Sequence, residues 1–237
     1  MLALITGASR GIGAATARRL AADGCTVVIH CHRQTDLAEA LAAELHGYSV
    51  SSDFSDLSKI DSLAETVLSQ YGTPDILVNN AAVSVSGLYQ DISDSDAEML
   101  FNVNLLSMMR LTKRLLPGMI SRKSGSIINI ASVWGETGAA CEVHYSVSKA
   151  AVIGFTKALA QEVGPSGIRV NCVSPGVIDT DMNRMHSTET MQQLADETPL
   201  CRIGTPEEAA EAIAFLASER ARFITGQVLS VNGGFYT

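Results

Sequence analysis

Short apolar segments alternate with longer segments of helical spacing along the whole chain. The apolar segments are rich in β-branched residues, and they cover residues 2–6, 25–30, 48–52, 75–80, 126–132, 168–174 and 227–231. The segments between them repeat alanine and leucine at helical spacing, as in 13–24, 35–47 and 205–219. Strands that are apolar on both faces belong to parallel sheets covered by helices on both sides. The pattern therefore predicts an α/β fold with a doubly wound, Rossmann-type, mostly parallel sheet of about seven strands.

The residues at the ends of the predicted helices support this division. The helices over 13–24 and 35–47 stop at Gly24 and Gly47, and glycine is the usual residue just after a helix. The helix over 205–219 begins with Thr205 as its predicted N-cap. No linker, repeat or low-complexity stretch interrupts the series, so we expect residues 1–237 to form a single domain.

Composition narrows the classes of partner. Hydrophobic residues make up 46% of the chain and charged residues 18%, and the formal net charge is −8. An acidic chain argues against nucleic acid or an anionic membrane as a partner, because phosphate binding needs clustered Lys and Arg. The apolar run after Met1 is too short for a signal peptide, and no run approaches the ~20 residues of a membrane span. These features predict a cytoplasmic chain with no membrane partner.

Cysteine and histidine carry no metal-binding pattern. The five cysteines are scattered without a C-x-x-C pair, which favours reduced, buried thiols over a disulfide framework or a zinc site. His30 and His32 alternate at a strand end, without Cys or Asp at metal-ligand spacing. We therefore predict no metal site.

A glycine-rich turn follows the first strand. The stretch "TGASRGIG" places glycines at 7, 11 and 13, where the backbone must turn sharply and a ligand can approach closely. The helix that follows directs its free N–H groups and positive dipole end toward an anion. A pyrophosphate is the expected occupant.

Tyr145 and Lys149 lie four residues apart, so on a helix the phenol and the ammonium face the same space. A free tyrosine has a pKa near 10, and a neighbouring ammonium lowers that pKa by favouring the phenolate. The pair could therefore donate a proton to a ketone that is being reduced. The alternative for these two residues alone is a solvated helix pair without chemistry.

Four motifs occur in a familiar order: "TGASRGIG" (6–13), "NNAA" (79–82), "YSVSK" (145–149) and "PGVIDTDM" (175–182). Together they resemble the short-chain dehydrogenase/reductase family over essentially the whole chain. The resemblance implies a dinucleotide-binding domain, an oxidoreductase acting on alcohol or carbonyl groups, and a homotetramer. It also implies that Ser132 bonds the substrate oxygen and that Asn104 connects Lys149 to solvent through water.

The end of the second strand bears on the choice of cofactor. Enzymes that use NAD tend to place an acid there, but "VVIHCHRQ" has none before Asp36, which fits the next helix better. Arg33, next to His32, and Arg10 in the glycine turn could instead form charge-assisted hydrogen bonds to a 2′-phosphate. We therefore predict NADPH.

The family resemblance extends the predicted cofactor site beyond these residues. Together with Tyr145 and Lys149, it comprises Gly7, Ser9, Arg10, Gly11, Ile12, Gly13, His32, Arg33, Asp53, Phe54, Asn80, Ala81, Ala82, Pro175, Gly176, Val177, Ile178 and Thr180.

The substrate is less tightly defined. The chain resembles the 3-oxoacyl-(acyl-carrier-protein) reductases of fatty acid synthesis, with two departures. Glu142 stands where those enzymes commonly carry glutamine. They also commonly have two basic residues near the site mouth for the acidic carrier; Lys123 matches one, but Ser166 stands at the other position.

A narrower branch that the sequence also resembles reduces a 5-aminopentanone group on a modified lysine of elongation factor P. Glu142, or more weakly Glu136, could pair with the amine of such a substrate, and Trp134 could stack on it. The alternative is that Glu142 hydrogen-bonds neighbouring backbone and only shapes the pocket.

The leading prediction is a carrier-linked or small-molecule oxoacyl ketone, because such reductases are the more common of the two. Elongation factor P is the alternative partner. A further alternative is a dinucleotide-sensing module without chemistry, against which the presence of Asn104, Ser132, Tyr145 and Lys149 argues.

Overall fold

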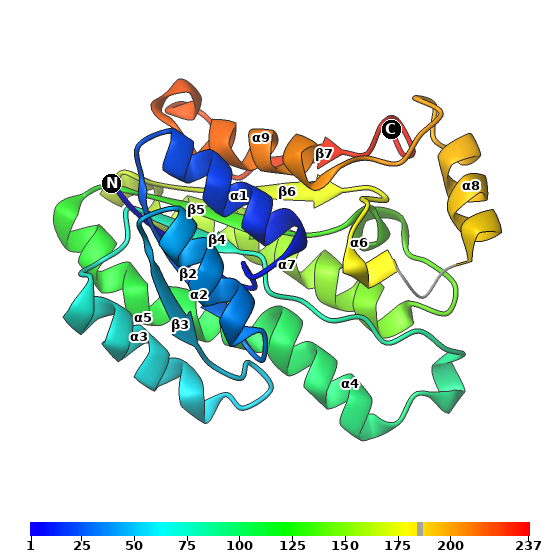
Figure 1. The fold of residues 1–237 in the computed structure, drawn as a ribbon, viewed down its shortest axis with the longest axis horizontal. Helices are drawn as coiled ribbons and strands as arrows, with labels where there is room; N and C mark the ends of the chain where they lie inside the picture. The colour runs from blue at the N-terminus through cyan, green and yellow to red at the C-terminus, as the bar shows by residue number, and fades with distance from the viewer. Residues whose placement is uncertain (184–186) are drawn as a thin grey trace.

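A central sheet of seven parallel strands organises the structure, a computed structural model that describes residues 1–183 and 187–237 (Figure 1). The strands lie in the order β3-β2-β1-β4-β5-β6-β7. Their bounds are β1 Leu2–Ile5, β2 Thr26–Cys31, β3 Tyr48–Ser51, β4 Ile76–Asn79, β5 Gly125–Ile130, β6 Ile168–Pro175 and β7 Val228–Val231. Each of the seven predicted strands is present within a residue or two of its predicted bounds, which confirms the doubly wound fold.

Helices cover both faces of this sheet (Figure 1). On one face, α1 (Gly11–Ala22), α2 (Thr35–Glu44) and α9 (Pro206–Ala217) pack on inward-facing strand residues such as Ile5 and Ile29. On the other face, α3 (Ser58–Gln70), α5 (Ser107–Arg122) and α7 (Val143–Val163) pack on the alternate positions, such as Leu4 and Val28. Because both sets of strand side chains are buried, both faces had to be apolar, as the sequence pattern indicates.

Shorter elements complete the described chain. The remaining α-helices are α4 (Asp94–Phe101), α6 (Val133–Thr137) and α8 (Thr188–Glu197). Short 3₁₀ turns cover Tyr89–Asp91, Gly164–Ser166, Asp181–Asn183 and Glu219–Ala221. A π-helical turn, Asn102–Leu106, lies between α4 and α5. The described part of the chain contains no helix long and apolar enough to cross a membrane.

The residue after α2 and the exposure of two cysteines differ from the predictions. Gly24 follows α1 with a φ of +84°, as expected, but the left-handed residue after α2 is His46, with a φ of +52°. Gly47 is needed for close packing instead, because a Cβ there would lie 2.5 Å from the carbonyl oxygen of Val27. Cys25, Cys31 and Cys172 are buried free thiols, whereas Cys141 and Cys201 are free but exposed, contrary to the prediction of burial.

The strand order reverses beside β1, which predicts a ligand site at one edge of the sheet. The chain passes from β1 outward through β2 to β3, and then returns to place β4 on the other side of β1. In doubly wound sheets, ligands bind beyond the carboxyl ends of the strands at this reversal. Most of the predicted site residues follow the carboxyl ends of β1 to β6, so the topology gathers these at one edge.

Candidate active site

The glycine turn after β1 has the backbone shape that a bound pyrophosphate requires. Gly7 and Gly11 have φ of +62° and +55°. A Cβ on Gly13 would lie 2.5 Å from the carbonyl oxygen of Gly7, so only glycine fits there. Among the described residues, neither the Arg10 side chain at the N-cap of α1 nor a first-turn acid satisfies the leading N–H groups. These groups are therefore free to bind an anion, and the turn fits a dinucleotide.

Asn80 and Ala81, directly after β4, are bound to this turn. The Asn80 side chain donates hydrogen bonds to the carbonyl oxygens of Thr6 (2.9 Å) and Gly7 (3.0 Å). In return, the Thr6 hydroxyl accepts from the backbone N–H groups of Asn80 (2.9 Å) and Ala81 (3.0 Å). The structure thus joins two motifs that lie about seventy residues apart in the sequence.

The residues predicted to select the cofactor lie at the ends of β2 and α1. Arg33 is exposed just after β2, and His32 lies 3.4 Å from the Asp53 carboxylate. The Arg10 guanidinium forms an ion pair with Asp181 at 2.9 Å. Arg10 therefore has a protein partner, which the sequence did not predict. Asp36 lies in the first turn of α2, as predicted.

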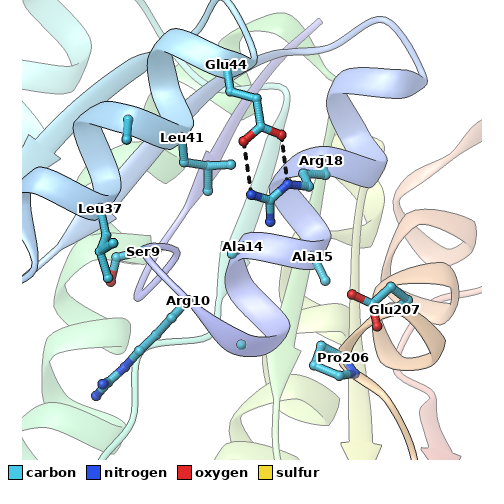
Figure 2. A pocket seen from close by; sticks show the side chains of 12 residues that line it. Ser9, Arg10, Ala14, Ala15, Arg18, Leu37, Leu41, Glu44, Pro206 and Glu207 are labelled. Atoms are coloured by element: carbon cyan, nitrogen blue, oxygen red, sulfur yellow. Dashed lines mark hydrogen bonds and ion pairs between the residues drawn. The ribbon is translucent and has the colours of Figure 1, made fainter. Parts of the chain in front are cut away.

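A cleft of about 330 Å³ lies beside the glycine turn, between α1, α2 and the start of α9 (Figure 2). Figure 2 shows an ion pair between Arg18 and Glu44 within this cleft, with Arg10 projecting away from the pair. The cleft is lined by the outer side of the turn and does not include Tyr145 or Ser132. The cleft therefore borders the glycine turn and lies apart from Ser132 and Tyr145.

The segment after β6 is fixed where the other end of a dinucleotide would lie. The N–H of Gly176 donates to the carbonyl oxygen of Val231 at 3.0 Å. The N–H of Gly204 donates to the carbonyl oxygen of Val177 at 2.9 Å. Thr180 lies against the glycine turn, because a Cβ on Gly11 would come within 3.4 Å of its methyl group. The structure therefore brings this segment and the glycine turn together, as predicted.

Ser132, Tyr145 and Lys149 meet at the carboxyl end of β5. Ser132 follows that strand and caps α6, where its hydroxyl accepts from the N–H of Trp134 at 3.2 Å. Tyr145 and Lys149 lie one turn apart on α7, both buried, and Tyr145 is hydrogen-bonded to Ser132. The Lys149 ammonium donates to the carbonyl oxygen of Ile130 at 2.9 Å and lies 5.6 Å from the centre of the Tyr145 ring.

Asn104 lies in the π-helical turn and is bound on two sides. Its carboxamide oxygen accepts from the N–H of Val83 at 2.8 Å, and its nitrogen donates to the Val83 carbonyl oxygen at 2.9 Å. The same nitrogen donates at 3.2 Å to the hydroxyl of Ser148, which lies between Tyr145 and Lys149. π-Helical turns often occur at functional sites, and this one connects Asn104 directly to the helix that carries the pair.

Burial is the main influence on the pKa values of Tyr145 and Lys149. It raises the pKa of Tyr145 to about 12; the hydrogen bond with Ser132 lowers this pKa in part, and the Glu142 carboxylate raises it further. Burial also lowers the pKa of Lys149 to about 8. The prediction that Lys149 brings the pKa of Tyr145 toward neutrality was therefore wrong for this state of the chain. The desolvation of the phenolate, which the sequence does not reveal, outweighs the neighbouring ammonium.

Glu142 is held by a loop that the sequence reading did not single out. Its carboxylate accepts from the hydroxyl of Ser84 at 2.6 Å and from that of Ser86. The N–H of Gly87 also donates to the carbonyl oxygen of Cys141 at 2.9 Å, so the loop after β4 is bound to the start of α7. The alternative that the Glu142 carboxylate bonds neighbouring backbone was wrong, because its partners are serine side chains.

Two further side chains near the site have partners that the sequence did not indicate. The Trp134 ring meets the Phe235 ring edge-on, with the ring centres 5.5 Å apart. The Ser230 hydroxyl donates to the Glu136 carboxylate at 3.1 Å. The end of the chain therefore packs against the segment that follows Ser132.

The sequence comparisons agree with this geometry. The family model described as enoyl-(acyl carrier protein) reductase matches residues 7–236. The chain belongs to the short-chain dehydrogenase/reductase family. It is 43% identical over 237 residues to an uncharacterized oxidoreductase of Bacillus subtilis (strain 168), YmfI, covering 99% of this chain and 98% of that protein.

The other similar relatives carry a more specific name. The chain is 40% identical over 237 residues to the 3-oxoacyl-(acyl-carrier-protein) reductase FabG of Escherichia coli (strain K12). It is 39% identical over 241 residues to FabG of Vibrio harveyi. Each alignment covers 99% of this chain and 97% of the relative. Short-chain dehydrogenases/reductases are oxidoreductases of alcohol and carbonyl groups that use nicotinamide dinucleotides, so this much is established for the chain.

The two positions expected to meet an acidic carrier lie elsewhere in this short-chain reductase. Lys123 precedes β5 and Ser166 precedes β6, and a Cβ on Gly167 would lie 2.5 Å from the Lys123 carbonyl oxygen. Lys123 and Ser132 are therefore separated by the whole of β5, about 20 Å for a strand of this length. Lys123 and Ser166 were predicted to lie near the mouth of the site. Within one chain this was wrong, because both residues lie at the amino ends of the strands and the site residues lie at the carboxyl ends.

Proposed function

We propose that this protein is an NADPH-dependent reductase that converts a ketone to a secondary alcohol, with Tyr145 as the proton donor. The observation that carries the proposal is the buried cluster of Ser132, Tyr145 and Lys149 at the carboxyl end of β5. A solvated helix pair would not be buried, and a binding module would not need a phenol hydrogen-bonded to a serine hydroxyl inside the crevice.

Each residue of the cluster has a role in this proposal. A bound reduced nicotinamide supplies the hydride. The Ser132 hydroxyl orients the ketone oxygen, and Tyr145 donates its proton to that oxygen as negative charge develops there. A pKa of about 12 keeps the phenol protonated at neutral pH, which suits reduction. Lys149 stabilises the phenolate that remains, and Asn104 positions α7 through Ser148.

The charge of Lys149 should set the alkaline limit of activity. Because burial lowers its pKa to about 8, the ammonium is present below that pH and is lost as the pH rises through it. We therefore expect kcat/KM, which reports groups of the free enzyme, to fall about tenfold per pH unit above pH ~8. Initial rates from pH 6 to 10 at low substrate concentration measure this. Lys149→Arg is the control, because its pH profile should lack this limb; a wild-type profile flat to pH 10 would refute the assignment.

The cofactor preference is tested at Arg33. We expect the wild-type enzyme to prefer NADPH to NADH, because Arg33 is exposed after β2 and no acid stands there to bind a ribose 2′-hydroxyl. Arg33→Asp should erase or reverse the ratio of the two kcat/KM values. Arg222→Asp is the control, because it makes the same charge change on an exposed residue before β7, at the amino ends of the strands. It should leave the ratio of the two kcat/KM values unchanged. Equal use of both cofactors by the wild-type enzyme would contradict this proposal.

The leading substrate class is a 3-oxoacyl group linked to a carrier protein or a small molecule. Its support is the name of the relatives that are 40% and 39% identical. The test measures NADPH oxidation in parallel with a 3-oxoacyl carrier substrate and an aminopentanone substrate. A protein that binds NADPH but turns over neither would favour the alternative of a dinucleotide-sensing module.

A second candidate substrate is the 5-aminopentanone group on elongation factor P. Glu142 favours it, because both of its hydrogen-bond partners among the described residues are neutral hydroxyls. A substrate ammonium would supply the opposite charge that this carboxylate lacks there.

We also propose that the enzyme assembles as a homotetramer. Several large apolar side chains are exposed in the single chain, including Leu106 and Val147, and Phe223 is fully exposed. Such side chains commonly become buried in a subunit interface. Light scattering gives the mass that tests this assembly.

A further inference from the structure

His30, the second-last residue of β2, joins two walls of the dinucleotide crevice through its imidazole ring. The residue is 2% exposed. Its Nδ1 lies 3.2 Å from the backbone nitrogen of Gly7, in the glycine turn, and its Nε2 lies 3.1 Å from the carbonyl oxygen of Ser52, after β3. The ring also stacks on Phe54, with centres 4.2 Å apart and an angle of 23° between the planes.

These contacts define the protonation state of the ring. A backbone N–H can only donate and a carbonyl oxygen can only accept, so Nδ1 is the acceptor and Nε2 carries the proton. His30 is therefore neutral. Burial lowers its pKa to about 4, which keeps it neutral at physiological pH.

The backbone of the same residue adds a third connection. The carbonyl oxygen of His30 accepts from the N–H of Ala8 at 2.8 Å, so two successive N–H groups of the turn are bound to one residue. On its other side, the ring contacts the segment that includes Asp53 and Phe54, the proposed border of the adenine. One side chain thus sets the distance between the pyrophosphate turn and the adenine wall.

We propose that His30 is a positioning residue for dinucleotide binding, holding the glycine turn and residues 52–54 in the arrangement that a bound dinucleotide requires. This inference rests on the proposed dinucleotide site but not on the choice between NADH and NADPH. A crevice that is already arranged binds without first ordering its walls. Because both cofactors share the adenosine and the pyrophosphate, His30 should affect the two affinities equally.

The experiment compares His30→Leu with His30→Asn by fluorescence titration of NADPH and NADH on the purified protein, without turnover. Leucine fills space but cannot accept from Gly7, whereas the asparagine oxygen can replace Nδ1. We expect His30→Leu to raise the dissociation constants of both cofactors about tenfold. This is the scale of one lost hydrogen bond to a buried donor. His30→Asn should stay within about threefold of wild type, and kcat at saturating NADPH should stay within about twofold in both variants.

Thermal unfolding of the cofactor-free proteins separates this role from packing. If His30→Leu does not fold, His30→Gln replaces it, because glutamine reaches toward Ser52 and loses the acceptor for Gly7; it should bind both cofactors more weakly than His30→Asn. Equal dissociation constants in all variants would overturn the inference alone, and so would a loss confined to NADPH. A wild-type protein that bound neither dinucleotide would overturn the proposed function as well.

Discussion

Replacing Tyr145 with phenylalanine is expected to lower kcat for ketone reduction by about 10²–10⁴-fold, the usual contribution of a placed general acid. The substitution removes only the hydroxyl, while the ring stays in the buried space between Ser132 and Lys149. The dissociation constant for NADPH, measured by fluorescence titration, should therefore stay within about twofold of wild type. A loss in kcat without a loss in cofactor binding is the result that identifies a proton donor.

Two comparisons make this result specific. Tyr48→Phe removes the hydroxyl of an exposed tyrosine on β3, which stacks on Tyr71, and should leave kcat unchanged. Lys149→Ala should lower kcat and also weaken NADPH binding, because Lys149 belongs to the proposed cofactor site as well as to the proposed catalytic cluster. If Tyr145→Phe kept more than about a tenth of wild-type activity, Tyr145 would not be the acid.

The sequence predicted the fold well because the evidence for it is local and repeated. Each strand segment is apolar on both faces, and this follows directly from a sheet buried between two layers. Thr205 was recognisable as an N-cap, and the structure shows the full capping box with Glu208. The helix end after α2 was not predictable in the same way. Both His46 and Gly47 could take the left-handed position there, and only the packed structure shows that His46 takes it while Gly47 packs against Val27.

The gathering of the site residues could be predicted, but their partners could not. Parallel strands bring Gly7, Asn80 and Ser132 to one edge because each follows a carboxyl end. The π-helical turn that holds Asn104 has no signature in the sequence. The pKa of Tyr145 depends on how completely the phenol is buried, which only the packed structure shows.

Hydrogen bonds between segments that lie far apart in the sequence also could not be predicted. Ser84 and Ser86 lie about sixty residues before Glu142, in a loop with no catalytic motif. The sequence neighbours of His30 indicate neither Gly7 nor Ser52 as its partners. In both cases a polar side chain acts through a contact that the fold creates, and no spacing rule covers it.

The selectivity of the enzyme should depend on the charge of Glu142. Tyr145 and Glu142 are three residues apart at the start of α7, so both side chains can address the same pocket. The hydroxyls of Ser84 and Ser86 donate to the carboxylate but carry no positive charge that would balance it. A carboxylate held in this way attracts a substrate ammonium and repels an acidic carrier or an anionic substrate.

Glu142→Gln keeps the size and the hydrogen-bonding capacity of the side chain but removes its charge. If the substrate carries an amine, we expect kcat/KM for an aminopentanone substrate to fall by the equivalent of about 2–5 kcal/mol, as for a lost charge pair in a partly desolvated site. The same change should leave kcat/KM for a neutral 3-oxoacyl substrate unchanged or raise it, because that substrate loses no partner. Glu162→Gln, an exposed position near the far end of α7, is the matched control and should change neither value. If the ratio of the two kcat/KM values were the same before and after Glu142→Gln, the carboxylate would only bind the loop after β4 to α7, and the carrier-linked substrate would gain support.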